Sequence, residues 1–316
     1  MTPSTRATPG GSRSRRPGRV LGRLGPAIMH AMAGALLRVL ALSLLFAAPT
    51  FGQEAEPPSP VSHEDASRGS DSPELTGYDI YQRVLENRHQ TFFQKQRLTS
   101  GDAGGSAAVT ELWTRWKDGH DANGQTKRGV LSKTLAKYTA PSRVRGAGYL
   151  VVQKEDGPDD QFVYFPSARR VRRVSLSEAI MGTDYSVEDI IPRELATSEY
   201  ERIADEVLDG VPCFVVDVIP KAEAGSQYAK LRSWVEKSHH VTIRTDYWDL
   251  DDQEIKRFTA PAAAIEEVEG VWLIREGTMA NLVEDSSTRL EVLEMEPNAK
   301  IRDSHFSTRS LESKGR

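Results

Sequence analysis

Cysteine is almost absent from this 316-residue chain, which contains only Cys213. A single cysteine cannot form a disulfide within the chain, so packing and hydrogen bonds must stabilise the fold. Cys213 lies in the apolar run of residues 212–219, where we expect a small buried side chain. It also lies far from the N-terminus, which excludes a lipid-anchored cysteine directly after an export signal.

Catalytic and metal-binding motifs are also missing. The chain has no Gly-x-Ser-x-Gly elbow and no phosphate-binding loop. Its seven histidines are scattered, and the adjacent pair His239-His240 has the wrong spacing for two metal ligands on one face. Asp249, Asp251 and Asp252 lack the glycine and the distant glutamate of a calcium loop, so we expect a hairpin turn there. The sequence therefore predicts no catalytic residue, no metal site and no cofactor.

Long apolar runs are confined to residues 33–48, near the N-terminus. Several arginines precede this run, and the small residues Thr50 and Gly52 follow it. A charged start, a short apolar middle and a small-residue exit are typical of a secretory signal peptide. The run is short for a membrane span. We therefore predict a signal peptide over residues 1–52 that is cleaved near Gly52.

Export points to the bacterial periplasm as the compartment. Translation can start at Met1, Met29 or Met32, and the sequence leaves this choice open. A twin-arginine signal at Ser14-Arg-Arg16 is an alternative route of export. The export segment contains no acidic residue although the whole chain has a net charge of −4, so the exported part is the more acidic. An acidic protein is a poor partner for nucleic acid.

Three regions follow from composition. After the signal peptide, residues 53–75 are rich in proline, serine and acidic side chains and predict a disordered tether. Residues 76–312 then predict a single domain. It begins with an amphipathic helix over residues 77–91, in which Thr76 is the N-cap and Asp79 completes a capping box.

The rest of the domain alternates between apolar and polar residues with a period of two, which indicates strands. Turn sequences such as Asp209-Gly210 separate the runs. No alternation of strands and helices is visible, so we expect an antiparallel, mostly meandering sheet. The predicted strands cover residues 91–99, 108–117, 128–138, 147–153, 160–165, 169–174, 199–208, 212–219, 229–236, 240–248, 254–264, 271–281 and 286–296.

One long insertion, residues 175–198, interrupts this rhythm. We expect a helical turn or two over residues 175–181 and a second short helix that Ser186 caps and that runs to Ile191. Insertions of this kind between strands often act as lids. The fold class is therefore mainly β with a few helices (α+β), with a strongly curved antiparallel sheet or incomplete β-barrel covered by helices.

An ordered series of short motifs resembles the outer membrane lipoprotein-sorting proteins of the LolA-like superfamily. The resemblance extends over about residues 78–312. The motifs are Pro141-Ser-Arg-Val-Arg-Gly146, Asp159-Asp-Gln-Phe-Val-Tyr-Phe-Pro166, Arg170-Val-Arg-Arg173, Met181-Gly-Thr-Asp-Tyr-Ser-Val-Glu-Asp189, Glu206, Asp209-Gly-Val-Pro-Cys213, Trp234-Val-Glu-Lys237, Tyr247-Trp-Asp249, Glu269-Gly-Val-Trp272, Met279-Ala-Asn281 and Phe306-Ser-Thr-Arg-Ser-Leu311.

This resemblance implies an incomplete barrel, closed on one side by helices, around a cavity for acyl chains. It also implies periplasmic relatives that often accompany RND-type transporters of lipids. The expected ligands are the acyl chains of a lipoprotein or lipid, and loading or unloading them requires transient contact with membranes. The expected protein partner is an inner-membrane RND-type transporter. We expect a monomer that does not bind nucleic acid.

Aromatic and thioether side chains suit an irregular and exchangeable ligand. We therefore take eight such residues as candidates for the lining or the rim of the cavity, although each is equally explained as ordinary core. The candidates are Phe162, Tyr164, Met181, Tyr185, Trp234, Trp248, Trp272 and Met279.

A basic run stands out directly before the insertion. Arg170, Arg172 and Arg173 are candidates to meet a phosphate headgroup or an acidic patch on a transporter. The alternative is a solvated edge strand whose arginines pair with Asp159, Asp160 or Glu188. Asp184 and Asp189, inside the insertion, are candidates to hold the lid closed by pairing with these arginines.

The sequence is compatible with three functions. The first is a periplasmic carrier or chaperone for a lipidated or otherwise hydrophobic ligand, which serves outer membrane lipoprotein sorting or lipid transfer. The second is an accessory module on the same scaffold that senses envelope lipids or docks on an RND-type transporter. The third is an exported hydrolase, which needs catalytic residues brought together from distant parts of the chain.

Overall fold

A capped helix begins the part of the chain that the computed structural model describes, residues 74–121 and 123–313. Helix α1 covers Gly77–Glu86, and Thr76 and Asp79 form the predicted capping box at its start. The helix is shorter than the predicted 77–91, because its C-cap Asn87 and the next three residues lead directly into the first strand. The predicted signal peptide and nearly all of the predicted tether lie outside the described residues.

Thirteen strands form one sheet, and every pairing in it is antiparallel, as predicted. The strand order is β6-β5-β4-β3-β2-β1-β15-β14-β11-β10-β9-β8-β7, so the first and the last strand in the chain pair with each other in the middle of the sheet. The strands are β1 Thr91–Asp102, β2 Ala107–Asp118, β3 Val130–Ala140, β4 Gly148–Lys154, β5 Asp160–Phe165, β6 Arg170–Arg173, β7 Ser198–Leu208, β8 Val211–Pro220, β9 Lys230–Glu236, β10 Thr242–Trp248, β11 Glu254–Thr259, β14 Glu276–Asn281 and β15 Ser286–Pro297.

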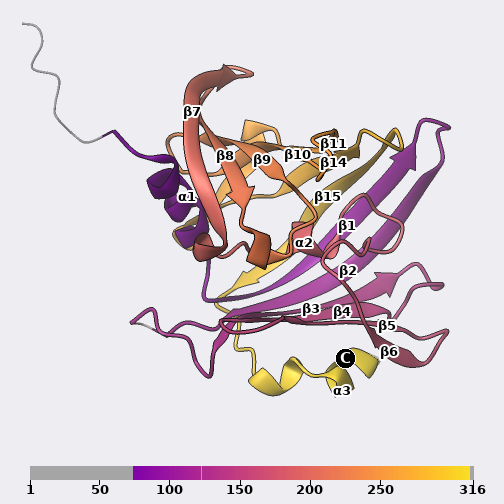
Figure 1. Ribbon diagram of the computed structural model, residues 1–316. Helices are drawn as coiled ribbons and strands as arrows, with labels where there is room; N and C mark the ends of the chain where they lie inside the picture. Colours follow the sequence, from indigo (N-terminus) through magenta and orange to yellow (C-terminus); the bar gives the residue numbers. More distant parts are fainter. Residues whose placement is uncertain (1–73, 122, 314–316) are drawn as a thin grey trace, which may run out of the picture. The chain divides into compact units, whose positions relative to one another are not determined.

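The sheet curves strongly and does not close into a barrel, which confirms the predicted fold class (Figure 1). A small second sheet contains only β12, Ile265–Val268, and β13, Val271–Ile274. The sequence predicted one strand over residues 271–281. The structure divides it at Arg275, because its first half pairs with β12 and its second half joins the large sheet as β14.

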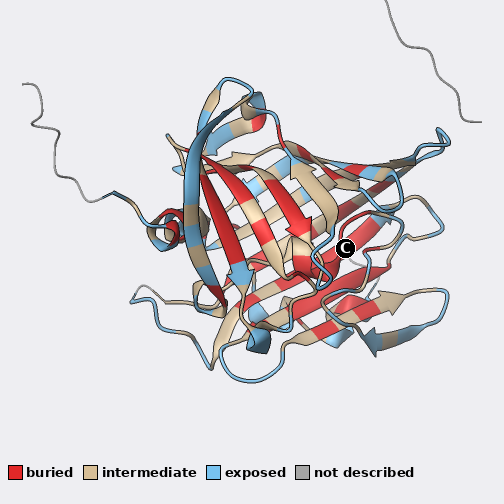
Figure 2. Ribbon diagram, turned by 45° about the horizontal axis from the view of Figure 1, so that its top comes forward, coloured by how far each residue is buried: buried red, intermediate tan, exposed pale blue. Residues whose placement is uncertain are grey.

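Both faces of the sheet are apolar, and different elements cover them. On the inner, concave face the main core includes Leu112, Tyr149 and Val216. The neighbouring side chains of the same strands point outward, and there Leu135 and Leu150 pack against Phe306 and Leu311. Figure 2 shows this alternation as buried and less buried bands along the strands.

Helix α3, Thr308–Glu312, carries Leu311 onto the outer face and contacts β4, β5 and β6. On the inner face, α1 contributes Ile80 and Tyr81 to the core and packs against β7 and β8. Most of the remaining cover on that face comes from the insertion between β6 and β7. We call residues 174–197 the lid.

The lid is mainly irregular. Helix α2, Val187–Ile190, follows the predicted cap Ser186, whose capping box with Asp189 is present. The helical turns expected over residues 175–181 do not form. Instead, Ala179 pairs with Ser186 in an isolated antiparallel bridge, so this part of the lid folds back on itself. A short 3-10 turn, Leu195–Thr197, then leads into β7.

Candidate functional site: a lid-filled hollow

The concave face of the sheet is a hollow lined with apolar side chains. Strands β1 to β4 contribute Leu98, Leu112, Ala136, Tyr138 and Tyr149, all of which are buried. These residues share one face because alternate residues of a strand point to the same side and the strands pair in register. The far wall of the hollow comes from β9, β10 and β14, through Leu231, Tyr247 and Met279.

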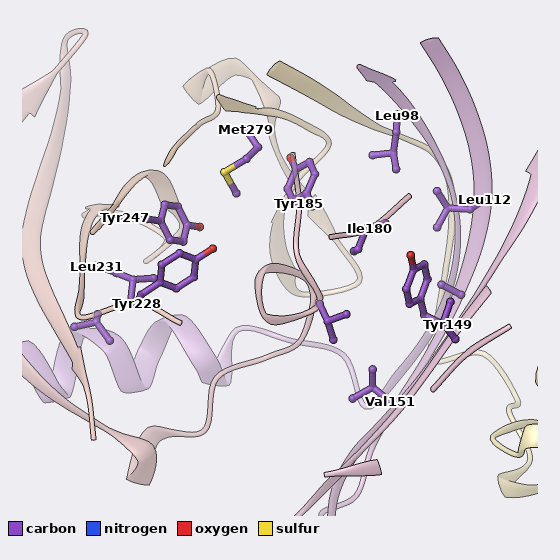
Figure 3. Packing of buried hydrophobic residues seen from close by; sticks show 14 of the residues in the cluster. Leu98, Leu112, Tyr149, Val151, Ile180, Tyr185, Tyr228, Leu231, Tyr247 and Met279 are labelled. Atoms are coloured by element: carbon purple, nitrogen blue, oxygen red, sulfur yellow. The ribbon is translucent and has the colours of Figure 1, made fainter. Parts of the chain in front are cut away.

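The lid fills most of this hollow with its own side chains. Ile180, Tyr185 and Val187 are buried in the same core as the strands. Figure 3 shows Ile180 and Tyr185 between the side chains of Leu98 and Leu112 and those of Tyr228 and Tyr247. The lid therefore occupies the position in which a ligand would contact the sheet.

A residual cavity of about 90 Å³ remains between the lid and strands β1 to β4. Its walls include Leu112, Tyr138 and Leu290 on the sheet and Ile180 and Tyr185 on the lid. Pockets that hold small molecules usually measure about 300–1,000 Å³. With the lid in this position, the remaining cavity is therefore smaller than a typical ligand site.

The tip of the lid is anchored on β15 by a buried carboxylate. Asp184 accepts hydrogen bonds from Ser286 Oγ at 2.5 Å and Thr288 Oγ1 at 2.6 Å. The backbone N–H of Asp184 donates to Thr288 Oγ1 at 3.0 Å. Thr288 itself is fully buried, so this anchor lies inside the domain.

A second anchor holds α2 against β11 and the β8–β9 connection. Asp189, whose side chain is fully buried, accepts from Tyr228 Oη at 2.7 Å and contacts Lys256 Nζ at 3.0 Å. Burial, followed by the charge of Asp189, raises the pKa of Tyr228 far above its usual value. Glu188 accepts a hydrogen bond from Ser226 Oγ, outside the lid, at 2.5 Å, and pairs with Arg193 inside the lid at 3.0 Å. The lid is thus held by polar side chains that surround an apolar filling.

Three of the eight candidate lining residues lie at the hollow. Tyr185 and Met279 are buried in the inner core, and Met181 packs against it. The backbone N–H of Met181 donates to Tyr149 Oη at 3.1 Å, which ties this part of the lid to β4.

The other five candidates lie elsewhere. Phe162 and Tyr164 face outward toward the helix α3 cluster, and Trp234 packs on the outer face with Cys213. Trp248 lies under Lys230, and Trp272 stacks on His239. The sequence pattern showed that both faces are apolar, but the direction of curvature decided which residues line the hollow.

The arginine run forms a short exposed edge strand, and of the acidic partners that the alternative interpretation named, only Asp160 pairs with it. Arg173 pairs with Asp160 at 2.6 Å, and Arg172 pairs with Glu178 at 2.5 Å. Arg170 is exposed on the same strand. The expected pairing of these arginines with Asp184 and Asp189 is not found, because β6 lies at the edge of the sheet and both aspartates are directed into the hollow.

Asp184 and Asp189 belong to the lid, as expected, but their partners are Ser286, Thr288, Tyr228 and Lys256. Sequence reasoning missed these four partners and also missed the inner-face residues of β1 to β4. The period-two alternation of Leu112, Thr114 and Trp116 was a usable signal for the latter. No local signal marks the partners of the lid, since they lie 39 to 104 residues away in the chain.

The described part of the chain offers few groups for chemistry. Within residues 74–121 and 123–313, no group of three or more histidine, cysteine or acidic side chains is placed to hold a metal ion. Cys213 is fully buried, as predicted, and burial raises the pKa of its thiol to about 11. Among the same residues, no helix is long and apolar enough to cross a membrane.

Two family models match this chain. A family model described only as an uncharacterized protein matches residues 131–313, which is more than half of the chain. The chain belongs to this family of uncharacterized proteins. The model of a second protein family of unknown function, DUF1329, matches residues 78–181. No curated protein matches the chain.

Solved structures show that the fold of this family member is LolA-like. A DUF1329 family protein from Desulfovibrio piger has 24% identity and a TM-score of 0.68, over 74% of this chain and 97% of that one. A protein from Vibrio parahaemolyticus, described as an outer membrane lipoprotein-sorting protein domain, has 21% identity and a TM-score of 0.67, over 75% and 98%. A LolA superfamily protein from Nitrosomonas europaea has 16% identity and a TM-score of 0.59, over 74% and 98%. The resemblance inferred from the sequence is confirmed at the level of the fold.

Proposed function

We propose that this protein is a periplasmic carrier that binds a lipid acyl chain, or the acyl chain of a lipoprotein, in the hollow under the lid. Binding involves no covalent chemistry. Export by the predicted signal peptide, transient contact with a donor and an acceptor membrane, and delivery through an RND-type transporter belong to the same proposal. The LolA-like fold supports it, since sorting proteins have this architecture.

The observation that carries the proposal is the nature of the cover over the concave face. The sheet presents a continuous apolar surface, yet an irregular segment with polar anchors covers it in place of a long packed helix. Such a segment can leave without unfolding the sheet, because none of the thirteen strands pairs with it. When the lid is closed, its apolar side chains occupy the place of the ligand.

Transfer energetics explain why a carrier needs this design. Moving an acyl chain from a membrane into water costs about 0.8 kcal/mol for each CH₂ group. A soluble carrier must offer an apolar surface of similar extent, and the same surface must stay covered when no ligand is bound. The side chains of Ile180, Tyr185 and Val187 provide that cover in the closed state.

A disulfide lock on the lid tests the proposal. The backbone N–H of Asp184 donates to Thr288 Oγ1 at 3.0 Å, so these two positions are in direct contact and are the pair chosen for the disulfide. We expect the oxidised Asp184→Cys/Thr288→Cys protein to take up a fluorescent fatty acid far more slowly than the reduced form. Adding a reductant should restore uptake. The Asp184→Cys single variant is the matched control, and buried Cys213 is poorly placed to interfere.

The disulfide experiment distinguishes a ligand site under the lid from a site elsewhere. Equal uptake by the oxidised and the reduced protein contradicts a ligand site under the lid.

Lipid extraction and native mass spectrometry of protein purified from its own compartment give a second test. Protein that is consistently free of lipid, together with no transfer of lipid between vesicles, contradicts the carrier function itself.

A further inference from the structure

A second, polar cavity lies further along strands β3 and β4, which also line the hollow. It has a volume of about 760 Å³ and lies between the inner face of β3 to β5 and the stem of the lid. Its apolar walls include Leu131, Leu176 and Ile191, and its polar walls include Gln153, Gln161 and Glu194. We call this cavity the polar cleft. Its volume falls within the range of about 300–1,000 Å³ that small-molecule sites occupy.

The inner face changes from apolar to polar along the strands toward this cleft. Near the centre of the hollow, Ala136 pairs with Tyr149, and Val163 also pairs with Tyr149. Four residues earlier on β3, Ser132 pairs with Gln153, and the two side chains are hydrogen-bonded. Both residues of this second pair are buried. One continuous surface therefore offers an apolar section followed by a polar section, which matches an amphiphile with a tail and a headgroup.

The cations of the cleft already have partners. Lys154 and Arg173 both contact Asp160, at 2.9 Å and 2.6 Å, and Arg193 contacts Glu188 at 3.0 Å. In total, three cationic and five carboxylate side chains line the cleft. Because carboxylates are in excess and the cations are paired, the cleft is better suited to a cationic group than to an anion.

Two hydrogen-bond acceptors in the wall of the cleft lack donors. Gln161 is only 7% exposed, and its Oε1 atom accepts no hydrogen bond. The Oε1 atom of Glu194, on the stem of the lid, is also buried and accepts none. Burial raises the pKa of Glu194, so the closed lid disfavours its charged form. A buried acceptor without a donor costs about 1–3 kcal/mol, and a ligand that supplies N–H or O–H groups removes this cost.

We propose that the polar cleft binds the headgroup of the amphiphile through an ammonium group that carries N–H bonds, donated to Gln161 Oε1 and Glu194 Oε1. This inference rests on the proposed function, since the tail of the same ligand occupies the hollow. Glu194 is part of the lid, and both acceptors are closed off in this conformation. The headgroup therefore reaches them as the lid shifts, which links recognition of the headgroup to opening of the hollow.

Two short-chain phospholipids with identical tails provide the test. Dihexanoyl phosphatidylethanolamine has an ammonium group with N–H donors, whereas dihexanoyl phosphatidylcholine has the same charge and no N–H donor. Titration calorimetry of the purified protein should show about tenfold tighter binding of the ethanolamine lipid, as expected for hydrogen bonds to a charged group. Free ethanolamine should bind far more weakly than the lipid, and equal affinity would overturn the link to a tail.

Two variants assign the preference to the proposed atoms. Gln161→Leu and Glu194→Gln should each reduce the preference for ethanolamine several-fold, and either one suffices if the other fails to fold. Glu199→Gln, which removes an exposed carboxylate on β7 outside the cleft, should leave it unchanged. Equal binding of both lipids to the unaltered protein overturns the headgroup site and leaves the carrier function standing. Binding of neither lipid contradicts the carrier function as well.

Discussion

The two faces of strands β3 to β5 bury similar apolar surfaces under very different covers. On the outer face, helix α3 places Leu311 against Leu135 and Leu150. On the inner face, the lid places Ile180 and Val187 against the same strands, yet it depends on buried aspartates for its attachment. The outer cover is a short helix held mainly by apolar packing, with one buried polar contact from Lys137 Nζ to the Leu311 carbonyl oxygen. The inner cover is an irregular segment held by several polar anchors.

This difference bears on which cover can be removed. Detaching α3 exposes the fully buried side chain of Leu311 to water, and exposing a buried leucine costs free energy. The anchors of the lid are carboxylates and hydroxyls, for which water is a competent substitute once the lid opens. The comparison therefore predicts a stable outer face and an inner face that opens locally.

The largest effect is expected from removing the cation that faces Asp189. Lys256→Met leaves the fully buried Asp189 carboxylate without its positive partner, and such a change costs about 3–5 kcal/mol. We expect the loss to appear mainly as opening of the lid. Hydrogen exchange of the Asp184 and Met181 amides, which donate to Thr288 Oγ1 and Tyr149 Oη on the sheet, reports this opening directly.

The matched control removes the negative charge of Asp189, which has no cationic partner in Lys256→Met. Adding Asp189→Asn to Lys256→Met should restore part of the exchange protection, because the amide is neutral. Exchange that stays slow in the single variant would show that the lid does not depend on this ion pair.

A packing change on the outer face should act on the whole domain. Leu311→Ala removes a fully buried side chain and should lower the free energy of unfolding by about 3 kcal/mol in a denaturant titration. Lid exchange under native conditions should remain close to that of the unaltered protein. Faster lid exchange of similar size would contradict the separation of the two faces.

The buried lysine under α3 gives a pH-dependent prediction. Lys137 Nζ donates to the carbonyl oxygens of Gly146, at 2.6 Å, and Leu311, and burial lowers the pKa of Lys137 to about 8. Because the folded pKa is below the unfolded value, the unfolded state binds more protons above pH 8, and stability rises with pH there. The protein should gain about 2 kcal/mol relative to Lys137→Met between pH 7 and 9.5.

Thermal or denaturant unfolding of both proteins across this pH range checks the sign, since other titrating groups cancel in the difference. Lys133→Met, on the same strand, controls for the loss of a positive charge. A difference between the unaltered protein and Lys137→Met that stays constant or falls with pH would contradict a depressed pKa at Lys137.

The smallest effect is expected at the edge strand. Arg172 and Glu178 are 47% and 33% exposed in their side chains, and exposed ion pairs contribute less than about 1 kcal/mol. Arg172→Gln should therefore change lid exchange only slightly, with Arg170→Gln as the control. A large effect that persists in high salt would show that this pair is a main anchor of the lid.

Most strands were predictable because a half-buried antiparallel strand needs local alternation and turn residues at its ends. The capping box of Thr76 and Asp79 and the short helix after Ser186 were predictable for the same local reason. The missed features were the separate hairpin of β12 and β13, and the bridge from Ala179 to Ser186 that replaced a predicted helical turn. These depend on pairing partners, which local patterns do not specify.

The candidate site was predictable only in part. The insertion was located in the sequence, and the structure brings Tyr185, Met181 and Met279 of the proposed lining to the hollow. Phe162, Tyr164 and Trp234 lie on the outer face, because an alternating strand has two apolar faces here and the sequence does not show which one is concave. The arginine run was conspicuous as charge, yet its partners are local acidic side chains at the sheet edge.

The amino-acid sequence alone determined the elements of this protein: where strands run and turn, where helices are capped, and that one long insertion interrupts the sheet. These follow from interactions between residues close together in the chain. Only the tertiary structure decided that the insertion lies inside the curve of the sheet, that Asp184 and Asp189 are anchored by β15 and β11, and that an apolar and a polar cavity lie beneath the lid. The curvature and the long-range pairing that produce these features are properties of the assembled sheet.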